Sequence, residues 1–173
     1  MKKILVAASI AIMLLMPLIF GGCNSSEREG FAIYLTKDDI PVSQMEALSR
    51  VEIADTPLIG INDIEGYHWD THDVELTVET YEKVSQLKVP TSGVSFVVCV
   101  DRQPIYWGAF WAMYSSSWFD GITIWYPLII YDEMPANSIT IRAATSPSNA
   151  PPIEDLRLSP IIKDSLEEAG KLK

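Results

Sequence analysis

Both histidines of the chain fall in one short polar segment. His68, Asp70 and His72 alternate along it, and alternate residues of a straight strand point to the same side. Two imidazoles and a carboxylate on one side could bind zinc or another divalent cation. The same residues also fit a polar surface turn, and their spacing matches no zinc-hydrolase motif such as H-E-x-x-H. We therefore predict a surface turn here, with a metal site as the alternative.

Aromatic residues are densest between residues 106 and 126. If residues 106–114 form a strand, aromatic side chains point to both of its faces, so either both faces are covered or one is a binding platform. Aromatic faces suit sugar rings, apolar peptide side chains and lipid headgroup boundaries alike. The segment is therefore core, a binding surface or a subunit interface, and a helix is its alternative conformation. The candidate surface residues are Tyr106, Trp107, Trp111, Trp118 and Trp125.

Other chemistry has no motif in this sequence. Ser115–Ser117 offers hydroxyl groups, but no G-x-S-x-G nucleophile elbow is present. Neither a Walker-type loop nor a G-x-G-x-x-G phosphate-binding loop occurs. Catalysis therefore has no support in the sequence, and we predict no catalytic residue and no cofactor.

The charge balance excludes one class of partner. The chain carries 13 Lys and Arg residues against 23 Asp and Glu residues, a formal net charge of −10. Nucleic-acid binding relies on clustered Lys and Arg that neutralise phosphates. We therefore expect no nucleic-acid role. Because 48% of the residues are hydrophobic, we expect a packed core rather than disorder.

The N-terminus is set apart by its pattern. Lys2 and Lys3 precede an apolar run from residue 4 to 16, and a polar stretch, residues 24–29, follows Cys23. The run has the length of a signal-peptide core and is shorter than the roughly 20 residues that span a bilayer. The pattern predicts an export signal that ends near Cys23.

The end of this run resembles the lipobox of bacterial lipoproteins. Gly21 and Gly22 match the small residues before the invariant Cys23, whereas Phe20 stands where the motif usually has Leu. The resemblance implies cleavage before Cys23 and a diacylglycerol on its sulfur, so that residues 1–22 are a signal peptide and 23–30 a lipidated tether. An uncleaved anchor or a plain secretory signal are the alternatives.

Beyond the tether, strand-like and helix-like stretches alternate, and we predict one α+β domain over residues 31–173. The sheet is expected to be mainly antiparallel, with two or three helices. Residues 95–100 and 104–113 are predicted to form a hairpin, and 121–130 to pair with 138–142. Cys99 lies in an apolar strand and is expected in the core. The other expected strands are 31–35, 51–54, 67–69 and 74–76. The expected helices are 78–88 and 160–169, with a short helix or irregular link at 43–50.

A wider resemblance rests on several of these stretches. The chain resembles a family of uncharacterised prokaryotic lipoproteins and is similar to the periplasmic head of the SecD protein-export factor. The resemblance implies an α+β fold and an exported location, and the export function itself does not carry over. The stretches that carry it are Phe31–Leu35, Leu58–Ile64, Val74–Thr77, Ser95–Asp101 and Pro104–Gly108.

Together these observations predict a lipoprotein held on the outer side of the cell membrane by the lipid on Cys23. Its domain is expected to be a non-catalytic binding module that recognises an envelope protein, a peptide or a glycan through the aromatic segment. A metal-dependent envelope enzyme using His68, Asp70 and His72 is the first alternative. A purely structural envelope component, with all aromatics in the core, is the second.

Overall fold

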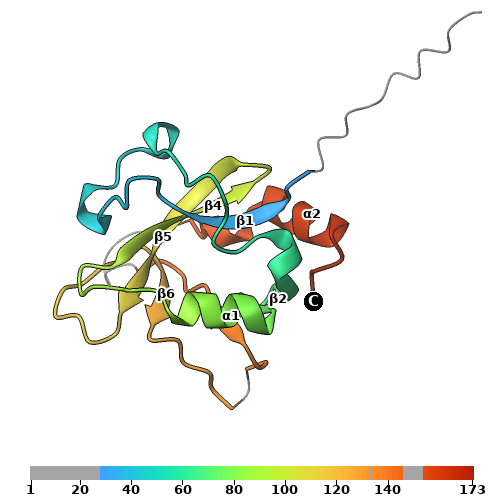
Figure 1. Cartoon of the computed structure of the whole chain (residues 1–173). Coiled ribbons are helices and arrows are strands. Elements are labelled where there is room, and N and C mark those ends of the chain that lie inside the picture. The colour runs from blue at the N-terminus through green and yellow to red at the C-terminus, as the bar shows by residue number, and fades with distance from the viewer. Residues whose placement is uncertain (1–27, 133, 146–153) are drawn as a thin grey trace, which may run out of the picture.

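Two β-sheets face each other in the computed structural model, which describes residues 28–132, 134–145 and 154–173 (Figure 1). The predicted signal peptide, Cys23 and most of the predicted tether lie outside these residues. The first sheet has the strand order β1-β4-β5-β6, and the second has the order β2-β3-β7. The strands are β1 (Phe31–Leu35), β2 (Ile64–His68), β3 (Asp73–Leu76), β4 (Val94–Val100), β5 (Gln103–Ala112), β6 (Ile122–Tyr126) and β7 (Ser138–Thr140).

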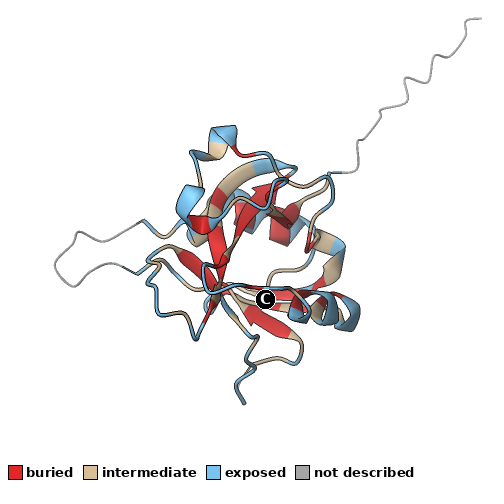
Figure 2. Cartoon of the chain, turned by 60° about the vertical axis from the view of Figure 1, so that its left-hand side comes forward, coloured by how far each residue is buried: buried red, intermediate tan, exposed pale blue. Residues whose placement is uncertain are grey.

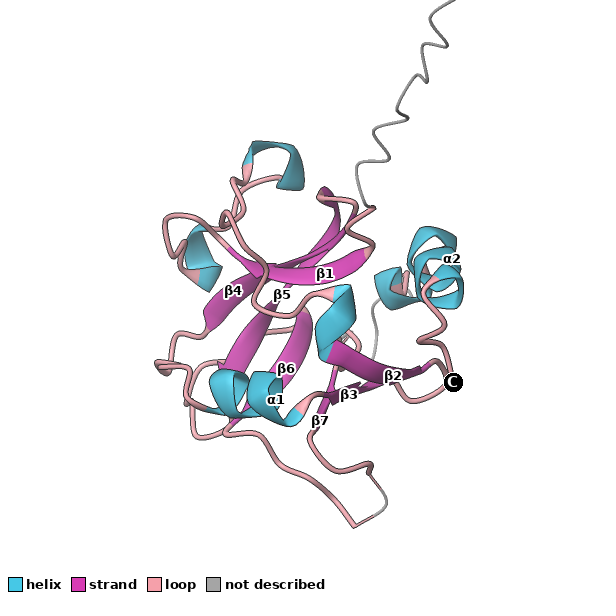
Figure 3. Cartoon of the chain, turned by 45° about the vertical axis from the view of Figure 1, so that its right-hand side comes forward, coloured by secondary structure: helices cyan, strands magenta, loops and turns pink. Residues whose placement is uncertain are grey.

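Two α-helices flank the sheets, α1 (Val78–Ser85) and α2 (Pro160–Glu168) (Figure 3). Thr77 caps α1, because its side chain accepts a hydrogen bond from the Thr80 amide. Pro160 occupies the first turn of α2, where its missing N–H costs nothing. Within the described parts of the chain, neither helix has the length and apolar character that a bilayer crossing requires. Short 3₁₀ turns lie at Val42–Gln44, Leu48–Arg50, Ile61–Asp63 and Leu156–Leu158.

The predicted α+β fold with mainly antiparallel sheets is confirmed. β4 and β5 form the predicted hairpin, joined by Asp101 and Arg102, which both have positive φ as a type I′ hairpin turn requires. The prediction that residues 121–130 pair with residues 138–142 as two strands is wrong. β6 is parallel to β5, β7 pairs with β3 in the other sheet, and a single bridge between Thr123 and Arg142 joins the two segments.

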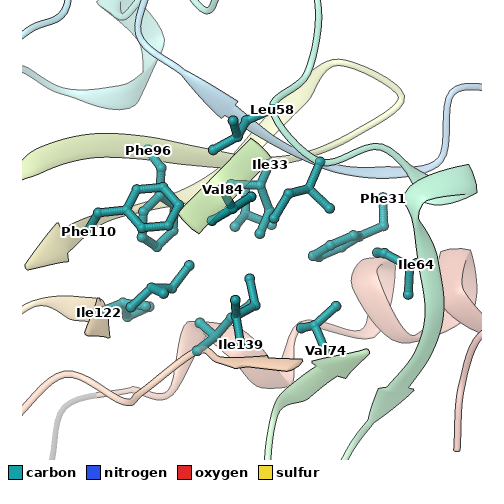
Figure 4. Close-up of a cluster of buried hydrophobic side chains, with 14 of the residues drawn as sticks. Phe31, Ile33, Leu58, Ile64, Val74, Val84, Phe96, Phe110, Ile122 and Ile139 are labelled. Carbon is teal, nitrogen blue, oxygen red and sulfur yellow. The ribbon is translucent and has the colours of Figure 1, made fainter. Parts of the chain in front are cut away.

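The main core fills the space between the two sheets (Figure 4). Every described strand and both helices contribute to it, and at least half of the residues of each strand are buried (Figure 2). Its fully or almost fully buried members include Phe31, Ile33, Ile64, Val74, Val84, Phe96, Phe110, Ile139, Ile162 and Leu166.

A smaller apolar cluster covers the other face of the first sheet. Tyr34, Val97 and Cys99 point to this face, and the segment 40–53 packs over them. Both faces of β1 and β4 are therefore covered, which explains why their sequences are almost entirely apolar rather than alternating. Cys99 is fully buried, as predicted, and burial raises the pKa of its thiol to about 12.

Candidate functional site

β5 sends its aromatic side chains to opposite faces of the first sheet. Tyr106 and Phe110 point into the main core, and Tyr106 is only 1% exposed. Trp107 and Trp111 point to the other face and are half-buried. Tyr106 is therefore a core residue, and its predicted place in the aromatic surface is wrong. The two tryptophans remain candidates for that surface.

Phe119 organises the tryptophan face. Its ring lies 5.4 Å from that of Trp111 in a stacked arrangement and 5.7 Å from that of Trp107. Phe119 belongs to the connection 113–121, which leads from β5 to the parallel strand β6 and therefore has to return along the sheet. Gly121 permits the close packing, because a Cβ there would collide with the Phe119 ring. Phe119 lies within the aromatic segment 106–126 that the sequence singled out, but it was not among the candidate surface residues.

Two hollows flank Phe119. The acidic cavity, of about 370 Å³, lies toward Trp107 and is lined by the carboxylic residues Glu46, Asp120, Glu154 and Asp155. The distal cavity, of about 460 Å³, lies toward the end of β5. Both volumes fall within the range of roughly 300–1,000 Å³ that is typical of small-ligand sites. The distal cavity is lined chiefly by Trp111, Met113, Ser117, Trp118, Trp125 and Arg142.

Arg142 and Trp125 form the polar end of the distal cavity. The Arg142 guanidinium carbon lies 3.9 Å from the centre of the Trp125 ring, a cation–π contact. Two backbone hydrogen bonds between Arg142 and Thr123, of 2.8 and 3.2 Å, hold the arginine beside β6. Among the described residues that line this cavity, Arg142 is the only charged one. The sequence prediction missed Arg142, because no local signal links it to Trp125.

Trp118 and Trp125 supply the exposed aromatic area of this cavity. The two residues are 81% and 40% exposed. The register pairs Trp125 directly with Trp111 on β5. The structure therefore brings Trp107, Trp111 and Trp125 to one face of the sheet, and Trp118 to the rim of the distal cavity beside it.

The three candidate metal ligands diverge. His68 lies with Nε2 2.5 Å from Oε1 of Glu75. His72 is 3% exposed, and its Nδ1 lies 2.8 Å from the Tyr67 hydroxyl. Asp70 is exposed in the turn between β2 and β3. Across the described ranges no group of three His, Cys, Asp or Glu side chains is arranged to hold a metal ion.

The backbone explains why the straight-strand assumption fails. His72 has φ of 58°, so the chain reverses at this residue instead of alternating. Its ring is directed into the protein beside Tyr67. Burial, assisted by the positive charge of Arg157, lowers the pKa of His72 to about 4, and the imidazole is therefore neutral at pH 7.

The chain enters the domain at the end of the first sheet that lies opposite the distal cavity, and hydrogen bonds fix this entry point. The Gly30 amide donates to Oδ1 of Asp101 at 2.9 Å, and the Asp101 amide donates to the Gly30 carbonyl at 3.0 Å. From Gln103, next to this point, to Trp111 β5 covers about 26 Å at about 3.3 Å per residue. Residues 28–30 and the connection 113–121 thus lie on opposite sides of the domain (Figure 1).

Comparison with known proteins adds no relative to this description. No protein-family model, no curated protein and no solved structure matches the chain. The resemblance to prokaryotic lipoproteins and to the SecD head therefore stays a prediction that rests on the quoted motifs.

Proposed function

We propose that this chain is a lipoprotein anchored through a lipid on Cys23, and that its domain is a non-catalytic binding module. The binding surface is the aromatic surface formed by Trp107, Trp111, Trp118 and Trp125. The observation that carries the proposal is where large apolar side chains are exposed. Of the eleven exposed large hydrophobic residues among those described, seven lie between Met113 and Tyr131.

Such a concentration favours an interaction surface. Single exposed apolar residues are common, but a contiguous exposed patch is unfavourable in water and marks a place where another molecule binds. Trp118 illustrates this, because it is 81% exposed and no described contact requires a tryptophan at this position. The purely structural alternative, with every aromatic in the core, does not account for it.

The anchor and the binding surface are compatible in space. From Cys23 to Gly30 a fully extended chain reaches at most about 25 Å at about 3.6 Å per residue. It enters the domain at the end of the sheet opposite the distal cavity. A lipid on Cys23 would therefore hold the entry side near the bilayer and present the aromatic surface away from it. Two or more acyl chains suffice for stable anchoring.

The anchor is tested by labelling the full chain with radioactive palmitate in a bacterial host. We expect label in the wild type and none in Cys23→Ser, because the thiol is the acyl acceptor. Cys99→Ala is the matched control and should keep the label, since Cys99 is buried in the core. Label that persists in Cys23→Ser would refute the anchor.

The binding surface is tested by screening the full chain in detergent against panels of glycans and peptides. Trp118→Ala should no longer bind the panel members that the wild type binds. Val78 is an exposed apolar residue on α1, and Val78→Ala should still bind them. Both variants should melt like the wild type, because both side chains are exposed. If Trp118→Ala keeps the complete wild-type ligand profile, the aromatic surface is not the binding site.

A further inference from the structure

We infer that the distal cavity binds a saccharide that carries a carboxylate, with one uronic acid residue placed at Arg142. This inference rests on the proposed function and names the ligand class of the same surface. It follows from three properties of the cavity, namely its exposed aromatic faces, its charge and its hydroxyl groups.

The aromatic faces are suited to sugar rings. A pyranose ring presents a flat face of C–H groups, which packs on an aromatic ring, while its hydroxyl groups remain at the edge. Trp118, at 81% exposure, stands on the rim of the cavity with most of its indole free to receive such a face. Ser117 and Thr145 also line the cavity, and their hydroxyls can donate to or accept from sugar hydroxyls.

The charge selects an anionic sugar. Arg142 is the only charged side chain among the described residues that line the cavity. Its guanidinium carbon lies 3.9 Å from the centre of the Trp125 ring, and the N–H groups of a guanidinium form a planar fork of donors. This fork matches the two oxygens of a carboxylate. In a uronic acid the carboxylate is attached directly to the ring, so one residue can place its ring on an indole and its carboxylate at Arg142.

The acidic cavity on the other side of Phe119 explains why the ligand is confined to one hollow. Its lining contains Glu46, Asp120, Glu154 and Asp155. Arg157 pairs with Asp155 at 2.6 Å and Arg50 lies 4.0 Å from Glu46, whereas no described cation pairs with Asp120 or Glu154. An anionic chain is repelled there. Arg28 and Arg50 line two other hollows, but each of these also contains carboxylates, whereas Arg142 is unopposed among the described lining residues of the distal cavity.

The single cation of the cavity and its position argue against the main competing occupant, a bilayer. Exposed Trp and Tyr side chains also suit a membrane interface. A surface that docks on anionic lipids, however, gains about 1 kcal/mol from each nearby Lys or Arg, and the distal cavity offers only Arg142 among its described lining residues. The site also lies at the far end of β5 from the predicted tether. A saccharide therefore fits the observations better than a bilayer.

The experiment titrates the full chain in detergent micelles with tetragalacturonate, followed by calorimetry and tryptophan fluorescence. The matched probe is the fully methyl-esterified tetragalacturonate, which keeps the rings and removes the charge. We expect the acid to bind and the ester to bind at least about tenfold more weakly, the loss that follows from removing a charge-assisted hydrogen bond. Added salt should weaken binding of the acid and leave the ester unchanged.

Variants separate the two contacts. Arg142→Gln should reduce affinity for the acid to that of the ester, and Arg142→Lys should lie between, because lysine keeps the charge but lacks the fork. Trp118→Ala should weaken both probes. Arg50→Gln is the control for a lost cation, since Arg50 is exposed and lines a different hollow. Thermal melts of all variants show whether each one is folded.

Each outcome decides the inference. Equal affinity for acid and ester, or an Arg142→Gln variant that binds like the wild type, overturns the role of the carboxylate. If neither probe binds while neutral glycans or peptides still bind through Trp118, the ligand class is wrong and the proposed binding module stands. Binding to phosphatidylglycerol vesicles that is lost in Trp118→Ala, without binding of either probe, identifies a bilayer as the occupant and overturns the inference.

Discussion

His72 makes the stability of this protein depend on pH in a predictable direction. Its ring is 3% exposed, is bonded to the Tyr67 hydroxyl at 2.8 Å and has Arg157 nearby. Burial and this positive charge both disfavour the imidazolium form, so the pKa of His72 falls from 6.5 to about 4 on folding. The unfolded chain therefore binds a proton more tightly than the folded protein between these two values.

The sign and the magnitude follow from this difference. The contribution of His72 to stability is fully present above pH 6.5 and is lost progressively as the pH falls toward 4. From these two pKa values, the free energy of unfolding should be about 2 kcal/mol lower at pH 5 than at pH 7. With a urea dependence of about 2 kcal/mol per molar, the unfolding midpoint should shift downward by about 1 M.

The assay is urea unfolding at pH 7, 6 and 5, followed by tryptophan fluorescence. His72→Asn removes the titrating group, tolerates the positive φ of 58° at this position and offers an amide to Tyr67. Between pH 7 and pH 5, we expect the free energy of unfolding of this variant to fall by about 2 kcal/mol less than that of the wild type. His68→Gln is the matched control, because it leaves His72 in place and should retain the wild-type loss from that residue. Equal losses in His72→Asn and the wild type would refute the assignment.

Three further predictions concern the fold. Phe110→Ala should lower the free energy of unfolding by about 3–5 kcal/mol in urea titrations, because the ring is fully buried. Thr77→Ala should cost about 1 kcal/mol by the same measurement, since the Thr80 amide loses its cap, and Thr77→Asn should cost much less. Deleting residues 171–173 removes the backbone hydrogen bonds of 2.7 and 2.9 Å to Tyr67, so amide exchange at Tyr67 should accelerate and the thermal midpoint should fall.

The local elements of this fold are predictable because their signals lie within a few residues. Thr77 is a good N-cap directly before a run with helical spacing, and α1 begins at the next residue. Pro160 can occupy only the first turn of a helix, and α2 begins there. The β4–β5 hairpin follows from two apolar runs separated by a short polar turn. None of these signals depends on which strands meet in space.

The pairing of β6 could not be predicted for the same reason. An apolar β-rich run such as Ile122–Tyr126 fits any open sheet edge. A sequential antiparallel partner is the commoner arrangement, and parallel neighbours usually need a connection of about a dozen residues or more. Here residues 113–121 make the return without a helix, and Phe119 packs across Trp107 and Trp111 on the way. The aromatic crowding is in part the structural requirement of this unusual connection.

The candidate site depends on that pairing. Trp125 lies beside Trp111 only because β6 is parallel to β5 in this register. Arg142 reaches Trp125 only through the bridge between Thr123 and Arg142, which brings the chain after β7 back to β6. With residues 121–130 paired along their length to 138–142, as the pattern predicted, nothing would place Trp125 beside Trp111. The sequence could therefore indicate the aromatic residues, whereas the cation that gives their cavity a chemical preference follows from the tertiary arrangement alone.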